Sequence, residues 1–359
     1  MTIFGTIAFI LFSQLAAPAS TLPGPVSIHA LEQTVPELMR KNNVAGVSLA
    51  MIRDGRVYWV KSFGVKDGDV PVTNDTTFEA ASLSKVVFAY AVLKLADQGK
   101  IDLDTPLQHY LDAPYIEGDP HINKITARMV LNHRTGLPNW RSEKGLTIYF
   151  EPGDHFSYSG EGFVFLAKAV ERITGQNLND FTQQMVFKPL GMTSSSYVWR
   201  PDYDARTAIG HDKDGKPRDK WKPNEANPAS SLQTTALDYA RFMTALLDGN
   251  GLKRGTLKHM ETPQIGVQQT CTVNCFGVAP LSTTVFWGLG VGLERTSNGL
   301  AFWHWGDNGS FKAFMVGYPD RKSGLVMFTN SENGLSLAGA VVKAALGSDQ
   351  PGLQWLNHP

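Results

Sequence analysis

Cysteine is scarce in this chain of 359 residues, which contains only Cys271 and Cys275. So few cysteines exclude a disulfide-rich scaffold and a zinc site built from cysteine ligands. The two lie four positions apart, so they either close a small disulfide loop in an oxidising compartment or remain ordinary thiols. Spacing does not decide between these alternatives, because geometry determines whether a disulfide forms. No metal or organic cofactor is expected, since the sequence has no ligand cluster at metal spacing.

An excess of charge of either sign is also missing. The 33 Lys and Arg residues balance the 33 Asp and Glu residues, so the formal net charge at pH 7 is zero. The absence of a basic run or an acidic tail argues against a nucleic-acid partner. We therefore expect a globular protein, monomeric, that acts on a small molecule or a peptide.

Long hydrophobic runs are rare. Residues 3–15 form a short apolar run, followed by Ala17-Pro18-Ala19, which fits an A-x-A cleavage site. The run is too short to span a bilayer comfortably. We therefore predict a signal peptide at residues 1–19 and a secreted or periplasmic protein with no stable membrane span after cleavage. One feature disagrees, because no Lys or Arg precedes Arg40.

The two ends of the chain favour a sheet with helices. Residues 27–41 place apolar side chains on one helical face, with a kink or break expected at Pro36. Asp54-Gly55 favours a type I′ turn between two strands. The expected strands are 47–52, 56–60, 285–294, 300–305, 311–318 and 325–330, and a closing helix covers 336–346. The glycines within 288–292 are attributed to close strand packing.

The middle of the chain favours helices, at 86–96, 126–132, 163–174 and 236–247, with a surface hairpin or loop at 210–228. We therefore predict an α+β fold, an α/β sandwich. Its antiparallel sheet is flanked by N- and C-terminal helices, and a mostly helical lobe lies beside it. The expected sheet lobe joins residues 24–84 and 283–350, and the helical lobe covers 85–282. A cleft between such lobes is a usual place for a small-molecule site.

A short S-x-x-K motif, Ser82-Leu83-Ser84-Lys85, opens the apolar helix at 86–96. Residues three apart lie on one helical face, so Ser82 and Lys85 are expected to point the same way. Unpaired N–H groups at a helix start favour developing negative charge. This combination suits an acyl-transfer nucleophile. The alternative is that Ser82 only caps the helix.

Two later motifs complete a recognisable order, Tyr158-Ser159-Gly160 and His304-Trp305-Gly306. The order S-x-x-K, Y-S-x, H-x-G resembles the penicillin-recognising serine hydrolases, closest to the class C β-lactamase, D,D-peptidase and esterase branch. Residues 131–138, 189–193 and 230–242 also match landmarks of that family. The similarity covers roughly residues 28–346 and implies a β-lactamase/transpeptidase-like fold.

The resemblance implies a mechanism in which Ser82 attacks a carbonyl and becomes acylated. Lys85 and Tyr158 act beside it as a coupled acid–base pair, and which of them is the base stays open. The oxyanion is expected to bind the backbone N–H groups of Ser82 and Asp307. His304 stands where many relatives carry Lys and keeps a hydrogen-bonding role near Tyr158.

Two departures from the family affect substrate choice. Gly160 replaces the Asn that usually closes Y-x-N, and Trp305 replaces the Thr of K-T-G. Losing these polar groups reduces discrimination for substrates that need them. Both changes argue against a dedicated cephalosporinase and are compatible with an esterase or an altered peptidase. Gly160, Trp305 and Gly306 remain expected substrate contacts.

Each assignment has a structural alternative. Tyr158 could be a core aromatic, and His304, between two tryptophans, a packing histidine. His133 is interpreted as structural, fixing the turn before Gly136-Leu137-Pro138. Several aromatic residues could line a cleft or pack at its rim: Trp140, Tyr149, Trp221 and Trp305.

The sequence thus predicts a secreted serine hydrolase that cleaves an ester, a D-amino-acid peptide or a β-lactam through a Ser82 acyl-enzyme. Carboxylesterase or D-alanyl-D-alanine carboxypeptidase-like activity ranks above β-lactam turnover. The alternatives are a penicillin-binding, receptor-like protein that acylates without efficient turnover, and a non-catalytic relative that binds peptides.

Overall fold

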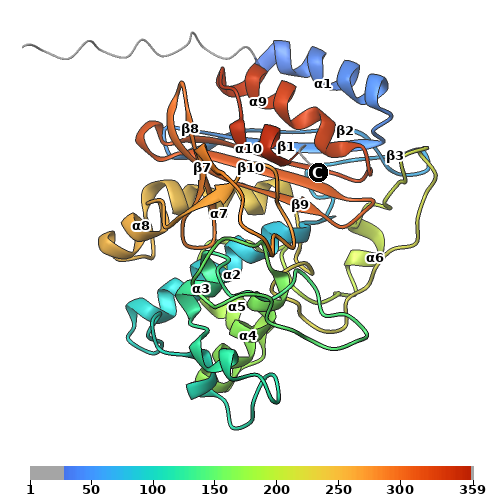
Figure 1. Cartoon of the computed structure of the whole chain (residues 1–359). Coiled ribbons are helices and arrows are strands. Elements are labelled where there is room, and N and C mark those ends of the chain that lie inside the picture. The colour runs from blue at the N-terminus through green and yellow to red at the C-terminus, as the bar shows by residue number, and fades with distance from the viewer. Residues whose placement is uncertain (1–27, 357–359) are drawn as a thin grey trace, which may run out of the picture.

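The computed structural model describes residues 28–356, and the predicted signal peptide at 1–19 lies outside this range. A nine-stranded sheet has the order β3-β2-β1-β11-β10-β9-β8-β7-β6, and neighbouring strands run antiparallel. Helices cover both faces (Figure 1), so the α+β prediction is confirmed. The strands are β1 (Gly46–Arg53), β2 (Arg56–Asp67), β3 (Val70–Pro71), β6 (Ile265–Gln268), β7 (Leu281–Trp287), β8 (Gly292–Thr296), β9 (Gly299–Asp307), β10 (Lys312–Tyr318) and β11 (Ser323–Thr329).

Both ends of the chain build the centre of this sheet. Strand β1 pairs with β2 on one side and with β11 on the other, so Val47 lies opposite both Phe63 and Thr329. The turn between β1 and β2 has positive φ at Asp54 (52°) and Gly55 (70°), as the type I′ prediction requires. Residues nearly 300 positions apart are thereby neighbours.

One face of the sheet is covered by α1 (Ile28–Asn42), α9 (Ala338–Leu346) and α10 (Pro351–Leu356). Helix α1 buries Leu31, Val35 and Met39. It continues through Pro36, so the expected break is absent. The sequence interpretation did not include α10.

The opposite face carries the long helices α2 (Ser84–Asp97) and α7 (Ala236–Asp248), and the remaining helices lie in the lobe beyond α2 or along the edges (Figure 1). These are α3 (Ala127–Leu131), α4 (Gly160–Thr174), α5 (Leu178–Thr182), α6 (Tyr203–Arg206) and α8 (Arg254–Met260). The four predicted helices of the middle region are confirmed as α2, α3, α4 and α7. Strand β4 (Phe78–Glu79), which precedes α2 in the chain, pairs with β5 (Gln233–Thr234) in a separate two-stranded sheet.

The prediction of one strand at 285–294 is wrong, because β7 and β8 form a hairpin with its turn at 288–291. Gly290 has φ +83°, and a Cβ there would lie 2.2 Å from the Cβ of Ala89 in α2. A Cβ at Gly288 would lie 2.0 Å from the carbonyl oxygen of Met260. Gly288 and Gly290 therefore serve a tight turn against α8 and α2, whereas a Cβ at Gly292 in β8 would lie 2.8 Å from the ring of Trp303 in β9, as close strand packing predicts.

The lobe assignment stays a prediction, although β6 joins the large sheet before the expected boundary at residue 283. None of the helices between residues 28 and 356 has the length and hydrophobicity to span a bilayer.

Candidate active site

Ser82 lies in a single 3₁₀ turn, Ala81–Leu83, between β4 and α2. Its neighbours Ala81 and Leu83 are buried, whereas Ser82 is partly exposed. The residue before α2 is Leu83, and it makes no side-chain cap, so Ser82 does not act as the helix cap. Ala81 has φ +48°, a left-handed conformation that costs about 1–2 kcal/mol for a residue with a Cβ. The turn therefore presents one hydroxyl from an otherwise buried and strained segment.

Hydrogen bonds from distant residues hold this turn. The Tyr239 hydroxyl donates to the carbonyl of Leu83 (3.0 Å), and the Tyr197 hydroxyl donates to the carbonyl of Ser84 (2.6 Å). The backbone of Leu232 accepts from the N–H of Ala80 (2.8 Å) and donates to the Ser84 hydroxyl (3.1 Å). Such support lets a strained turn persist.

The Lys85 ammonium group lies directly beside the nucleophile candidate. Its Nζ donates to Ser82 Oγ (3.1 Å) and to the carbonyl of Ala229 (2.8 Å). It also lies 4.9 Å from the ring centre of Tyr158 and 5.5 Å from that of Trp140. Burial lowers the pKa of Lys85 well below its usual value, and no acidic group among residues 28–356 offsets that shift. A neutral amine is a proton acceptor, so burial makes this lysine a usable base.

Tyr158 approaches the same point from the segment just before α4. Ser159 caps α4, because its Oγ accepts from the N–H of Gly162 (3.0 Å), and this fixes the preceding residue. Burial raises the pKa of Tyr158, and the nearby Ser82 hydroxyl opposes that rise. The Tyr158 hydroxyl is buried and has no hydrogen-bond partner of ordinary geometry among the described residues. It therefore lies near Ser82 as a neutral phenol.

Gly160 is the first residue of α4, and its position explains the missing Asn. A Cβ at Gly160 would lie 2.9 Å from the indole ring of Trp140 and 2.9 Å from the carbonyl oxygen of Asn139. An amide side chain at 160 would therefore displace Trp140. Trp140 is 45% exposed, and its ring centre lies 5.5 Å from the Lys85 Nζ.

His304 on β9 is fully buried. Its Nδ1–H donates to the carbonyl of Trp305 (2.7 Å), which leaves Nε2 as a hydrogen-bond acceptor. That Nε2 has no partner among residues 28–356, and the ring centre lies 6.0 Å from that of Tyr158. Burial is the main cause that lowers the pKa of His304 to about 3, and Lys85 adds to this shift when it is protonated. The imidazole is therefore neutral where many relatives carry a lysine cation.

The end of β9 passes very close to the turn Ala81–Leu83 that carries Ser82. A Cβ at Gly306 would lie 2.5 Å from the carbonyl oxygen of Ala80 and 3.1 Å from the Cβ of Ala81. Asp307 follows, with its carboxylate paired to Lys312. Only glycine at 306 allows this approach of β9 to the two residues that precede Ser82.

Trp305 and His133 both pack against the ring of Tyr158. The Trp305 ring is 8% exposed and lies 4.7 Å from the Tyr158 ring centre, within the aromatic cluster behind the sheet. The His133 ring stacks on Tyr158 at 4.3 Å, and its Nδ1 accepts from the N–H of Ser159 (3.0 Å). The sequence placed Trp305 at the substrate and gave His133 a role in a turn. Neither prediction anticipated contact with the tyrosine.

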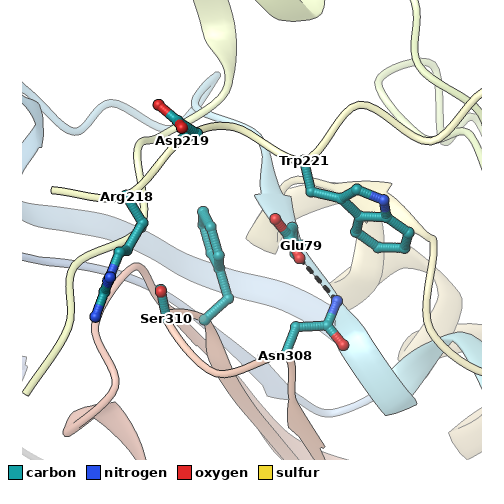
Figure 2. Close-up of a pocket in the computed structure, with 8 residues that line it drawn as sticks. Glu79, Arg218, Asp219, Trp221, Asn308 and Ser310 are labelled. Atoms are coloured by element: carbon teal, nitrogen blue, oxygen red, sulfur yellow. Dashed lines mark hydrogen bonds between the residues drawn. The ribbon is translucent and has the colours of Figure 1, made fainter.

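A cavity of about 370 Å³ is lined by Glu79 of β4 and by residues that follow β9, and Ser82 does not line it. Figure 2 shows the hydrogen bond between Glu79 and Asn308 in this cavity, with Trp221 beside them. Asn308 Nδ2 donates to Glu79 Oε2 (2.7 Å) and to the carbonyl of Ser230 (3.2 Å). Burial raises the pKa of Glu79 to about 7, and the bond from Asn308 opposes that rise. Sequence reasoning missed this bridge, since nothing in Phe78-Glu79 signals a partner at position 308.

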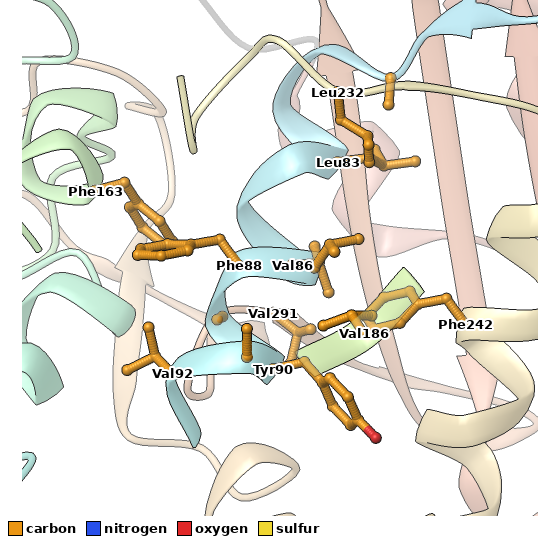
Figure 3. Close-up of a cluster of buried hydrophobic side chains, with 14 of the residues drawn as sticks. Leu83, Val86, Phe88, Tyr90, Val92, Phe163, Val186, Leu232, Phe242 and Val291 are labelled. Carbon is orange, nitrogen blue, oxygen red and sulfur yellow. The ribbon is translucent and has the colours of Figure 1, made fainter. Parts of the chain in front are cut away.

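Helix α2 is packed on all sides behind the site. In Figure 3, Val86 and Phe88 of α2 lie in a cluster with Phe163 of α4 and Phe242 of α7. A helix fixed in this way cannot move Ser82 relative to Lys85 without disrupting the core.

Among the described residues, no group of three or more His, Cys, Asp and Glu side chains is arranged to hold a metal ion. Cys271 and Cys275, whose pairing the sequence left open, form a disulfide.

Comparison with known proteins gives a consistent result. "Penicillin-binding protein 4" of Amycolatopsis lactamdurans is 28% identical over 61% of this chain, a match that covers 64% of that protein, less than two thirds of its length. A penicillin-binding protein homologue from Pyrococcus abyssi, described as octameric, superimposes with a TM-score of 0.75 at 22% identity over 90% of this chain and 78% of that one. A D-alanine carboxypeptidase from Burkholderia cenocepacia gives 0.75 at 20% identity, over 89% of this chain and 98% of that one.

At these identities the structural likeness establishes the fold. The family is established by a model described as Beta-lactamase, which matches residues 31–346 and so covers most of the chain. The resemblance expected from the three motifs is thereby confirmed. This chain belongs to the Beta-lactamase family, within the penicillin-recognising serine hydrolases.

Proposed function

We propose that this protein is a serine hydrolase that forms an acyl-enzyme on Ser82. The observation that carries the proposal is the 3.1 Å contact between Ser82 Oγ and a buried Lys85 whose pKa is strongly lowered. A serine hydroxyl is a weak nucleophile on its own and needs an adjacent base. The family membership supports the same chemistry.

In this mechanism Lys85 takes the proton of Ser82 as the oxygen attacks a carbonyl carbon. Tyr158 then supplies a proton to the leaving group and is reprotonated from Lys85. The direction of the shifts supports this division, because burial favours a neutral amine at Lys85 and a neutral phenol at Tyr158. The two groups form one coupled pair, so their macroscopic pKa values belong to both.

The tetrahedral oxyanion is proposed to bind the N–H groups of Ser82 and Asp307. The close passage of β9 at Gly306 supports this pairing. Each such donor typically contributes about 3–4 kcal/mol to transition-state stabilisation.

His304 is proposed to accept a hydrogen bond, directly or through water, from the substrate or from Tyr158. Its Nε2 is buried and unpartnered within the described part of the chain. A neutral imidazole does not attract a carboxylate as a lysine cation does, so substrate carboxylates lose one attraction here.

For the substrate, we propose an ester or a D-amino-acid peptide ahead of a β-lactam. The Trp140 ring fills the space beside Gly160, and the site has no side-chain amide at that position for an acylamino group. Trp305 is buried behind Tyr158, so it offers no hydroxyl in place of the family threonine. Secretion and a monomeric state belong to this proposal as predictions from the sequence.

A second candidate is a penicillin-binding, receptor-like protein that acylates without efficient turnover. One observation favours it: the Trp140 ring packs over Gly160 next to Lys85, where it reduces the room for a hydrolytic water.

Burst kinetics with a p-nitrophenyl ester distinguish these functions. Continued release after a stoichiometric burst supports the hydrolase, and a burst alone supports the receptor-like protein. A Ser82→Ala variant should lose both phases, and Tyr158→Phe should slow acylation by about 10²–10⁴-fold. If neither phase occurs with esters, D-alanyl peptides or penicillins, the non-catalytic peptide-binding alternative gains.

A further inference from the structure

The connection between β6 and β7 contains the disulfide between Cys271 and Cys275. We call residues 271–275 the disulfide loop. Cys275 is 2% exposed, whereas Asn274 is exposed and Val273 is 38% exposed. The loop thus has one buried side and one side in solvent.

The buried side of the loop lies along the segment that carries Tyr158. Val273 forms a parallel bridge with Tyr158 itself. The N–H of Cys275 donates to Ser157 Oγ (3.0 Å), and Nε2 of His155 donates to the carbonyl of Cys275 (3.0 Å). The loop therefore contacts the backbone or side chain of three residues at and just before the tyrosine.

Asn274 extends this contact beyond the tyrosine. Its Oδ1 accepts from the N–H of Asn139 (2.9 Å), and the carbonyl of Asn139 accepts from the N–H groups of Gly160 and Glu161 (3.0 and 2.9 Å). Asn274 has φ +55°, a left-handed conformation that asparagine tolerates better than most residues. One short loop thus braces both the approach to Tyr158 and the helix start that follows it.

The aromatic residues around Tyr158 supply only part of its support. Trp287 and Trp305 contact only the ring. His133 also accepts from the N–H groups of Ser157 (2.8 Å) and Ser159 (3.0 Å), so it holds the backbone from one side and the loop holds it from the other. The tyrosine hydroxyl must stay within reach of Ser82, and a displacement of about 1 Å can cost about 10²-fold in rate.

We propose that the disulfide-closed loop is a positioning element for Tyr158, so that the oxidised chain is the fully active form. The inference rests on the proposed function of Ser82 and Tyr158. Opening the loop removes the constraint between Cys271 and Cys275, and the bridge from Val273 then loosens.

Reduction is a balanced two-electron step. A dithiol such as dithiothreitol transfers two electrons and two protons to the bond between the two Sγ atoms. The products are two thiols and the cyclic disulfide of the reagent.

The test compares wild type with the C271S/C275S variant in ester acylation, pH profile and thermal unfolding. We expect kcat to fall by about 10- to 100-fold with a smaller change in KM, and the pH profile of acylation to shift, while cooperative unfolding is kept. Val278→Ser is the matched control, since Val278 lies in the same connection and is 83% exposed. It should behave like wild type.

If the double cysteine variant does not fold, two variants at Asn274 test whether the loop positions Tyr158. Asn274→Gly keeps the left-handed backbone but removes the acceptor for Asn139, so kcat should fall. Asn274→Asp keeps an acceptor oxygen and should restore kcat toward wild type.

Wild-type kcat and pH profile in C271S/C275S, or equal kcat in the two Asn274 variants, would overturn the inference. Failure of the proposed function looks different, because wild type itself would then show neither an adduct on Ser82 nor turnover. Dithiothreitol followed by reoxidation should lower and then restore the activity of wild type, and leave C271S/C275S unchanged.

Discussion

At the scale of single residues, the side chain of Lys85 lies buried beside Ser82 without a carboxylate partner among the described residues. The unfolded chain binds a proton at this lysine up to about pH 10.4, whereas the folded chain releases it at lower pH. Stability therefore rises with pH between the folded and unfolded pKa values. The group that we propose as the base thus lowers the free energy of unfolding at neutral pH.

A Lys85→Met substitution should therefore stabilise the protein at pH 7 by about 1–4 kcal/mol while abolishing ester turnover. Thermal unfolding of both proteins at pH 7 and pH 9.5 checks this, and the advantage of the variant should shrink at the higher pH. Lower stability of the variant at both values would contradict the buried, unpaired state of Lys85.

Glu79 makes the free energy of unfolding depend on pH in the opposite direction, because its pKa is raised. Its folded-state pKa is raised from 4.5 to about 7, so the unfolded chain loses this proton first. The contribution to stability is complete below the unfolded pKa and is lost as the pH rises through the folded pKa.

Glu79→Gln should remove that loss, because the amide oxygen still accepts from Asn308 Nδ2. Its stability advantage should appear above about pH 5 and level off above about pH 7, at about 1–3 kcal/mol. Urea unfolding between pH 4 and pH 8 measures it. Asp219→Asn, at an exposed carboxylate in the same cavity, is the control. If the free energy of unfolding depended on pH in the same way in wild type and Glu79→Gln, the raised pKa of Glu79 would be refuted.

Spacing was enough to pair Ser82 with Lys85, because residues three apart share a helical face. The resemblance to the family, carried by the order of the three motifs, added Tyr158. Contacts made by backbone atoms escaped that reasoning. The carbonyl of Ala229, which accepts from Lys85, has no side-chain signal. The conflict between Gly160 and Trp140 arises from a helix start and a loop that only the fold brings together.

At the scale of elements, close approaches at glycine decide how the helices dock on the sheet. Gly352 in α10 lies against β9, and a Cβ there would lie 2.4 Å from the ring of Trp303. Gly339 in α9 is open by comparison, since a Cβ there would meet only Leu353, at 3.9 Å.

Gly352→Ala should therefore destabilise the protein by about 1–3 kcal/mol through overpacking. Gly339→Ala should be neutral or stabilising by up to about 1 kcal/mol, because alanine favours the helix. Thermal unfolding of the two variants tests the pair. An unchanged Tm for Gly352→Ala would mean that α10 does not pack on Trp303.

Helices with strong start signals were predictable from the sequence. Thr126 and Thr235 each cap a helix through a side-chain oxygen, and α3 and α7 follow as expected. The hairpin at β7 and β8 was missed because apolar residues continue through its turn. Helix α10 was missed because six residues carry too little periodicity.

At the scale of the whole molecule, one core cluster joins the sheet to the helical lobe. It contains Val326 and Phe328 of β11 together with Phe88 of α2 and Leu166 of α4. The order of predicted strands and helices along the chain suggested two lobes and a sheet shared by the two ends. The pairing of β1 with β11 is a long-range contact that no local pattern encodes.

We therefore expect a single calorimetric unfolding transition for the two lobes, with equal calorimetric and van't Hoff enthalpies. Two resolved transitions would contradict a common core.

The most direct test of the account is mass spectrometry of the intact protein after exposure to esters, D-alanyl peptides and penicillins. The account predicts a mass increase equal to the acyl group of at least one substrate, mapped to the peptide that contains Ser82 and absent from Ser82→Ala. An adduct that maps to another residue, or one that persists in Ser82→Ala, would contradict it.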